Sequence, residues 1–161
     1  MDAIGSRAAL KRAHEFLGPE APVEAAAAFF SRGGVLTSVL TTGIAGAAGG
    51  LPAGLILTGV RHATAQPTAP QAWPKLMLLT LMPDRLLMLT MSAGTGRVLG
   101  LFGEIDRRAY RVLDVRTVGL VAKRMPLQLS DRSVVELDTK YIGMNRHNPR
   151  VIEAIAAAGR L

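Results

Sequence analysis

The side chains that most often carry catalysis or bind metals are few in this chain and do not form a recognisable cluster. The 161 residues include no cysteine, which excludes thiolate nucleophiles, disulfide bonds and zinc sites built on cysteine. The three histidines, His14, His62 and His147, lie in separate segments, with no second histidine or carboxylate at the spacing of a metal site. We therefore expect no catalytic residue, no metal and no cofactor, and interpret the chain as non-enzymatic.

A glycine-rich segment at residues 94–100 spells G-x-G-x-x-x-G, and Asp114 follows at the distance of a ribose-binding acid. Dinucleotide binding at such a turn requires a helix whose first turn faces the pyrophosphate. Gly100 and Gly103 would interrupt this helix, and too little chain remains for a doubly wound sheet. We predict a loop between two strands here instead of a nucleotide site.

Glu104 and Asp106 come closest to a pair of catalytic carboxylates, because alternate residues of a strand share one face. Two basic residues follow them directly, Arg107 and Arg108, and would neutralise such a pair. We expect ion pairs on the protein surface at this position and no acid–base chemistry.

The longest feature of the sequence is a stretch without any charged residue at 33–60, between Arg32 and Arg61. Its 28 residues exceed the roughly 20 apolar residues of a membrane-spanning helix, but eight glycines and Pro52 lower its hydrophobicity and helix propensity. Small residues recur at every fourth position, as in closely packed membrane helices. Two interpretations stay open: a shallow helical hairpin that enters the membrane, or one that packs on the protein or on a second subunit.

The chain is strongly basic, with a formal net charge of +7 and a pI near 10.8. Such a charge suits an anionic membrane face or nucleic acid, although an arginine-rich composition with solvated charges would produce it too. The few aromatic residues are not interleaved with the basic ones, which disfavours nucleic acid. Arg32, Arg61 and Lys75 flank the apolar stretch and the Pro/Ala/Gln-rich linker at 63–74, and we predict that these three residues bind lipid headgroups.

Local signals predict one helix at each end of the chain and a series of short strands between them. Ser6 caps the first helix and Gly18 ends it, whereas Asn148 is the predicted N-cap of the last helix, with Pro149 in its first turn. The segment 22–30 is ambiguous, because its four alanines favour a helix and its flanks favour a strand. The predicted strands span residues 76–82, 85–91, 101–106, 111–117, 120–123, 126–129 and 133–137.

The strands at 76–82 and 85–91 are apolar on both faces, so we expect at least one of them to lie against a further layer. No crossover helices separate the strands, which favours an antiparallel sheet. We predict a small barrel or bent sheet whose open end is closed by the C-terminal helix. Because aromatic residues are few, five methionines are expected to fill its interior: Met77, Met82, Met88, Met91 and Met125.

Just over half of the chain shows a family pattern, with LMLLTLMPDRLLML at 76–89, GEIDRRAYRVLDVRTVGLVAKRMPLQLSDRSVVEL at 103–137 and NPRVIEAI at 148–155. These segments resemble the bacterial pleckstrin-homology-like domains of the YokE/GRAM-like group. The resemblance implies a barrel whose first strand lies at 22–31 and whose first inter-strand loop carries the apolar insertion. It also implies a non-catalytic binding or assembly scaffold. Arg132 stands where such hairpins commonly carry glycine, so we expect a different type of turn there.

We predict a mainly β α+β fold, with an N-terminal helix at 1–20 and a pleckstrin-homology-like domain at 21–161 that is interrupted by a helical Gly/Ala-rich insertion and its linker at 33–74. The predicted function is association with the cytoplasmic face of the membrane, where the domain positions a protein partner. The alternative is a soluble homo-oligomeric scaffold with the insertion packed between subunits. Eight apolar residues of the insertion would contact the membrane: Leu36, Val39, Leu40, Ile44, Leu51, Leu55, Ile56 and Leu57.

Overall fold

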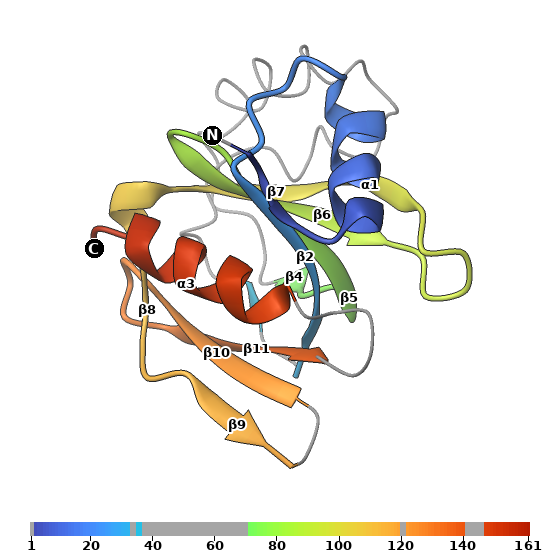
Figure 1. Cartoon of the computed structure of the whole chain (residues 1–161). Helices are drawn as coiled ribbons and strands as arrows, with labels where there is room; N and C mark the ends of the chain where they lie inside the picture. The colour runs from blue at the N-terminus through green and yellow to red at the C-terminus, as the bar shows by residue number, and fades with distance from the viewer. Residues whose placement is uncertain (1, 33–34, 37–70, 120–121, 141–146) are drawn as a thin grey trace.

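The fold consists of a bent antiparallel sheet with one helix near each end of the chain (Figure 1). The computed structural model describes residues 2–32, 35–36, 71–119, 122–140 and 147–161, with the backbone alone at 35–36, 71–72 and 140. The described elements are β1 (Ile4–Gly5), α1 (Arg7–Leu17), β2 (Ala25–Ser31), β3 (Val35–Leu36), β4 (Gln71–Ala72), β5 (Leu76–Leu81), β6 (Arg85–Met91), β7 (Val98–Asp106), η2 (Arg107–Ala109), β8 (Tyr110–Val112), β9 (Arg116–Val118), β10 (Ala122–Leu129), β11 (Val134–Lys140) and α3 (Asn148–Ala158).

The main sheet follows the order β7-β6-β5-β2-β11-β10-β8, with β9 beside β10 and with β1 pairing in parallel with β2. β2 is the central strand, since it pairs with β5 from Ala25↔Leu81 to Phe30↔Leu76 and with β11 at Leu137↔Ser31. The outer strands β7 and β8 do not pair with each other among the described strands, so the sheet is open. α3 lies across this open side (Figure 1). The prediction of a mainly β fold with a C-terminal helix is confirmed at this level.

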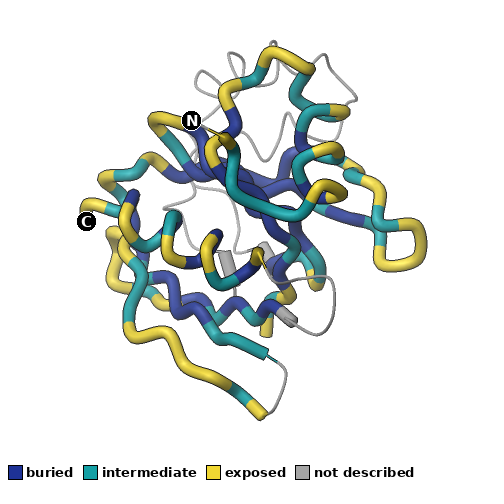
Figure 2. Tube along the Cα trace, in the orientation of Figure 1, coloured by how far each residue is buried: buried dark blue, intermediate teal, exposed yellow. Residues whose placement is uncertain are grey.

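The inner side of the sheet and α3 enclose the larger of two hydrophobic cores. Val151, Ile152 and Ile155 form the buried stripe of α3, as the helical spacing of these apolar residues predicts. Figure 2 shows the buried segments on the facing strands. The largest fully buried side chains of this core are Phe29, Met77, Leu79, Leu81, Leu86, Met88, Tyr110 and Met125.

The smaller core lies on the other side of the sheet, under α1. Ala9 and Ala13 of α1 are buried there with residues of β2, β5, β6 and β7. This second layer confirms that the two strands with two apolar faces lie against further structure. It also corrects the expectation that all five methionines fill the interior, because Met82 and Met91 belong to the core under α1.

The caps of the first helix are as predicted, and the cap of the last helix is not. Ser6 Oγ accepts a hydrogen bond from Ala9 N at 3.1 Å, and α1 ends at Gly18. Asn148 has a buried side chain whose Nδ2 donates to Thr139 Oγ1 at 2.7 Å. Thr139 Oγ1 in turn donates to the Ala28 carbonyl at 3.0 Å, so the pair joins α3, β11 and β2. The predicted capping role of Asn148 is wrong, because its side chain has a tertiary partner instead.

The outer strands of the second half of the sheet also differ from the prediction. The segment 111–117 is divided between β8 and β9, and β10 is one continuous strand that contains Pro126. The Pro126 carbonyl accepts a hydrogen bond from Leu113 N at 2.9 Å. Pro126 therefore faces the interruption between β8 and β9, where its missing N–H donor breaks no ladder bond.

The β10–β11 hairpin turns at Arg132, whose φ of 70° lies in the left-handed region. Asp131 Oδ1 accepts a hydrogen bond from Ser133 N at 2.8 Å, and Arg132 N donates to Leu129 O at 2.9 Å. Arginine itself adopts the conformation that glycine would adopt more easily, and these local bonds hold it there.

Candidate functional site

The apolar insertion begins and ends at neighbouring positions of the sheet. Ser31, the last residue of β2, donates from its backbone N to Lys75 O at 3.1 Å and from Oγ to Pro74 O at 2.6 Å. Beyond these bonds β3 and β4 form a short antiparallel ladder, in which Val35 pairs with Ala72 and Leu36 with Gln71. We call this arrangement, residues 31–32, 35–36 and 71–75, the stem of the insertion.

Of the eight residues predicted to contact the membrane, the structure describes only Leu36, as backbone of β3. The insertion therefore starts as a strand and not as the predicted helix, because Val35 and Leu36 pair with the returning chain. Val39, Leu40, Ile44, Leu51, Leu55, Ile56 and Leu57 lie outside the described residues. Within the part of the chain that the structure describes, no helix combines the length and apolar character needed to cross a membrane.

Two of the three predicted headgroup-binding residues lie at the stem. Arg32 and Lys75 are both exposed and flank the hydrogen bonds of Ser31. Arg32 Nε lies 3.7 Å from Asp138 Oδ2, so this arginine already has an acidic neighbour. Arg61 lies outside the described residues.

Trp73, near the end of the Pro/Ala/Gln-rich linker, is buried in the larger core. The side chain is only 5 % exposed, and its ring lies 5.5 Å from that of Phe102 at an angle of 51°. Phe102 is the extra residue of a β7 bulge, between the pairs Met88↔Gly103 and Leu89↔Leu101. A bulge re-aims a side chain, and here it accompanies an aromatic contact that fastens the end of the linker to the core.

A ladder of ion pairs continues from the stem across the outer face of β9, β10 and β11. Arg124 Nε and Nη2 donate to the two carboxylate oxygens of Asp138 at 2.8 and 3.1 Å, and Arg116 Nη2 donates to Glu136 Oε1 at 3.2 Å. The hydrogen bond to Asp138 raises the pKa of Arg124 above its ordinary value. Neither acid is among the residues predicted from the sequence, although alternation along β11 places both on one face.

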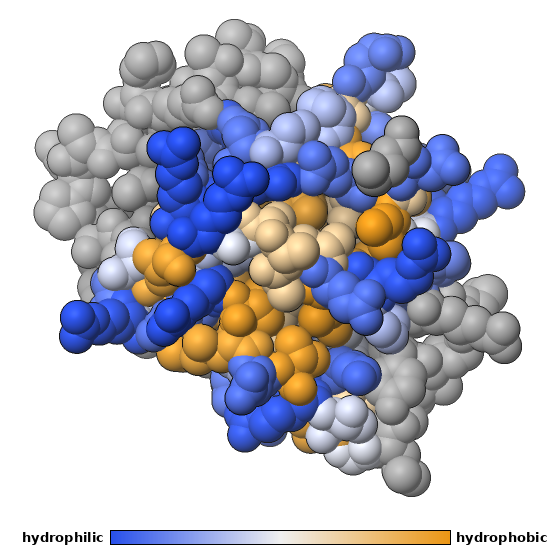
Figure 3. All heavy atoms as spheres, turned by 60° about the vertical axis from the view of Figure 1, so that its left-hand side comes forward, coloured by the Kyte–Doolittle hydropathy of each residue, from blue (hydrophilic) through white to orange (hydrophobic). Residues whose placement is uncertain are grey.

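A mostly apolar groove of about 600 Å³ runs beside the C-terminal half of α3. Figure 3 shows hydrophobic residues gathered in the middle of this face of the molecule, with hydrophilic residues around them. The groove is lined by residues at the N-terminus, in the loop before β2, at the end of β5 and the turn that follows, in η2 and in α3: Asp2, Ile4, Pro22, Val23, Glu24, Leu81, Pro83, Arg107, Ala154, Ala157 and Ala158.

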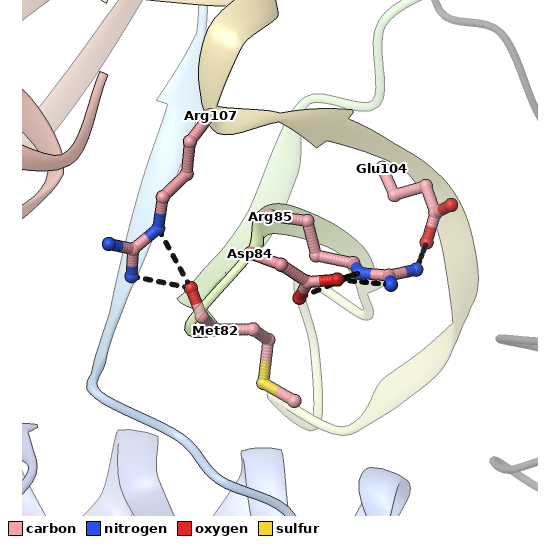
Figure 4. Close-up of polar contacts among 5 residues, drawn as sticks. All are labelled: Met82, Asp84, Arg85, Glu104 and Arg107. Atoms are coloured by element: carbon pink, nitrogen blue, oxygen red, sulfur yellow. Dashed lines mark hydrogen bonds and ion pairs between the residues drawn. The ribbon is translucent and has the colours of Figure 1, made fainter. Parts of the chain in front are cut away.

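The polar residues at the β5–β6 turn are held by two arginines (Figure 4). Arg85 Nη1 donates to Glu104 Oε2 at 2.8 Å, and Arg85 Nε lies 3.0 Å from each carboxylate oxygen of Asp84. Glu104 is only 8 % exposed. The predicted surface ion pair of Glu104 with Arg107 or Arg108 is wrong, since its partner is Arg85 on the neighbouring strand.

Arg107 has a different role at the same turn. Its Nε and Nη2 donate to the Met82 carbonyl at 3.0 and 2.6 Å, and its guanidinium also pairs with Glu24. Asp106 Oδ1 accepts a hydrogen bond from Arg108 N at 2.8 Å, as a local cap of η2. Among the described residues, no three His, Asp or Glu side chains are grouped so that they could hold a metal ion.

Comparison of the chain with protein-family models, with curated proteins and with solved structures finds no match. The candidate site is therefore defined by three features of this structure: the stem, the ion-paired face beside it and the groove along α3. Of these three, the stem is the one that continues directly into the apolar segment.

Proposed function

We propose that this chain is a non-enzymatic pleckstrin-homology-like module that associates with an anionic membrane face through its apolar insertion and positions a protein partner there. The observation that carries the proposal is the stem. β2 and β5 pair without interruption from Ala25↔Leu81 to Phe30↔Leu76, and Ser31 is bonded to Lys75. Two antiparallel neighbours need only a tight turn to connect them. The insertion is thus not required for that connection, which leaves it free to make an external contact.

Charge at the stem favours an anionic surface as that contact. Arg32 and Lys75 are exposed where the uncharged segment leaves the sheet, and the whole chain carries a net charge of +7. Each basic residue near an anionic leaflet contributes about 1 kcal/mol to binding. A mainly β fold with a C-terminal helix across the open side of its bent sheet is compatible with such a module.

The paired residues of the stem define the experiment. Because Leu36 pairs with Gln71, residues 37–70 can be replaced by an Asn-Gly turn that closes the β3–β4 ladder as a hairpin. Cells that express the full chain are fractionated without detergent, and the membrane pellet is extracted with high salt and then with carbonate. We expect the full chain to resist both extractions and the shortened variant to stay in the supernatant with an unchanged thermal midpoint.

Two results would contradict the proposal. The first is a folded, shortened variant that stays in the membrane pellet as firmly as the full chain. The second is a full chain that is soluble without detergent as a defined oligomer, whose shortened variant is a monomer. That second result would support the alternative of a soluble scaffold with the insertion between subunits. The double variant Arg32→Gln/Lys75→Gln, with the insertion intact, separates the contribution of charge: we expect weaker membrane binding that depends less on the salt concentration.

A further inference from the structure

A pocket between α1 and the start of β7 has no part in the function proposed above. Its volume is about 390 Å³, and it is lined by Arg12, Glu15, Phe16, Arg97 and Val98. Small-molecule sites commonly have roughly 300 to 1,000 Å³. The pocket combines two guanidinium groups with two apolar side chains, which is an amphipathic lining.

Both arginines of the pocket lack a carboxylate partner. Neither Arg12 nor Arg97 forms an ion pair within the described residues. Every Asp and Glu of the chain belongs to those described residues, so no acidic side chain elsewhere in the sequence could pair with them. Glu15 lines the pocket, but it lies 3.7 Å from Lys11 and is itself exposed. Two cations that face one pocket repel each other unless an external anion lies between them.

The guanidinium of Arg12 lies beside Gly96. Gly96 has a φ of 66°, and a Cβ atom at this position would lie 2.8 Å from Arg12 Nη2 and 3.2 Å from Cζ. The absence of a side chain at Gly96 therefore makes the room that the guanidinium of Arg12 uses. The adjacent residue is Arg97, so the turn that carries Arg97 also lies beside the guanidinium of Arg12.

We propose that Arg12 and Arg97 form a binding site for a phosphate monoester. The phosphate lies between the two guanidinium groups, whose planar forks match its oxygens, and the apolar part of the ligand packs on Phe16 and Val98. A phosphate monoester carries close to two negative charges at neutral pH, so it neutralises both arginines at once. The site is built from α1 and the β6–β7 turn, and it does not depend on membrane association.

The register of the sheet places this pocket at the same end of the sheet as the stem. Phe30 pairs with Leu76 beside the stem, Met77 pairs with Thr90, and Met91 pairs with Val98 of the pocket. A phosphate monoester could reach the site as a free small molecule or as the headgroup of a lipid, and an experiment with both forms distinguishes them.

The test for the free form is a calorimetric titration of the full chain and its variants with phenyl phosphate. We expect saturable binding that Arg12→Gln and Arg97→Gln each weaken by about tenfold, because each substitution removes charge-assisted hydrogen bonds. Arg7→Gln is the matched control: it removes the same charge from the same helix, at a residue that does not line the pocket. Equal weakening in the Arg7 variant would overturn the proposal, because it would show attraction by net charge alone. Arg97→Lys keeps the positive charge but removes the planar fork of donors. It tests the site even if Arg12→Gln does not fold.

The test for the lipid form uses phosphatidylcholine vesicles that contain either phosphatidic acid, a monoester, or phosphatidylglycerol, a diester. If the ligand is a lipid headgroup, we expect the full chain to prefer phosphatidic acid, and Arg97→Gln to abolish that preference without abolishing vesicle binding. Binding of phenyl phosphate without this preference would assign the site to a soluble ligand. If neither phenyl phosphate nor phosphatidic acid is bound through these arginines, the proposal fails, whatever the insertion does.

Discussion

Gly159 lies so close to Tyr110 that a Cβ atom at this position would be 2.8 Å from the ring Cε2 and 2.9 Å from the Tyr110 carbonyl oxygen. The Tyr110 hydroxyl donates to Ile155 O at 3.2 Å, and the Tyr110 carbonyl accepts from Leu161 N at 3.1 Å. Tyr110 thus contacts both the last turn of α3 and the tail that follows it. This contact fastens α3 across the open side of the sheet.

Substitution of Gly159 by alanine should destabilise the protein, although its φ of −68° is one that alanine adopts without strain. The new methyl group would meet the Tyr110 backbone as well as its ring, and overpacking of this kind costs about 1 to 3 kcal/mol. Chemical denaturation measures the loss. Gly94→Ala is the matched control, because a Cβ at Gly94 meets nothing within 4 Å, and we expect it to leave stability unchanged.

Stability should fall in strongly alkaline solution because of Tyr110. Burial raises the pKa of Tyr110 to about 12, from the usual value of 10, with smaller effects from Arg107, which lowers it, and Glu24, which raises it. As the pH rises, the unfolded chain therefore loses the Tyr110 hydroxyl proton at a lower pH than the folded chain does. The contribution of Tyr110 is complete below pH 10 and is lost as the pH rises to about 12, a change of about 2 to 3 kcal/mol.

Urea unfolding across this pH range tests the effect, with Tyr110→Phe as the control. The variant should be about 1 kcal/mol less stable at neutral pH, because it lacks the hydrogen bond to Ile155, and its alkaline loss should be smaller. An equal alkaline loss in the variant would assign the effect to other groups. The chain has only two tyrosines, so Tyr141→Phe leaves Tyr110 as the single source of the phenolate absorbance.

Arg85 and Glu104 should stabilise the fold only when both residues are present. Their side chains are 14 % and 8 % exposed and meet at 2.8 Å. Arg85→Met leaves Glu104 without this partner, and we expect a loss of about 3 to 5 kcal/mol. The double variant Arg85→Met/Glu104→Leu should recover most of that loss. A double-mutant cycle by chemical denaturation measures the coupling, and simple additivity of the two substitutions would contradict it.

Substitution by valine should change the stability of the protein in opposite directions at two buried threonines. Thr80 is fully buried, and its Oγ1 has no hydrogen-bond partner among the residues that the structure describes. Thr80→Val should therefore raise stability by about 1 kcal/mol, since it removes an unsatisfied hydroxyl with little change of shape. Thr139 bonds both Ala28 and Asn148, so Thr139→Val should cost about 1 to 3 kcal/mol. Thermal unfolding of both variants would show the two signs.

Arg132→Gly should stabilise the β10–β11 hairpin. The left-handed φ of 70° costs an arginine roughly 1 to 2 kcal/mol, and the greater chain entropy of glycine offsets part of the gain. We expect a net rise of about 0.5 kcal/mol in the free energy of unfolding. Arg108→Gly, at an exposed residue of η2 without a positive φ, should instead lower stability by about 0.5 to 1 kcal/mol. Stabilisation of both variants would show that the cause is loss of positive charge.

Elements that depend on neighbouring residues in the chain were predictable from local chemistry. α1 begins after Ser6 and ends at Gly18, and Pro83 and Asp84 form part of the turn between β5 and β6. β2 was ambiguous, because its alanines favour a helix in isolation. In the fold, Ala25 and Ala27 face the core under α3 and Ala26 faces the core under α1. Small residues let helices approach a central strand from both sides, and this packing overrides the intrinsic propensity.

The order of residue types fixes the uncharged segment, its basic flanks, the lack of cysteine and the number of carboxylates, because these are properties of composition and position. Strand pairing and helix packing bring Ser31 to Lys75, Asn148 to Thr139, and Arg12 and Arg97 to one pocket. Alternation and helical spacing indicate which face of an element is buried, but they do not specify which distant element will face it. That choice depends on the free energy of the whole packed core, which no local pattern contains.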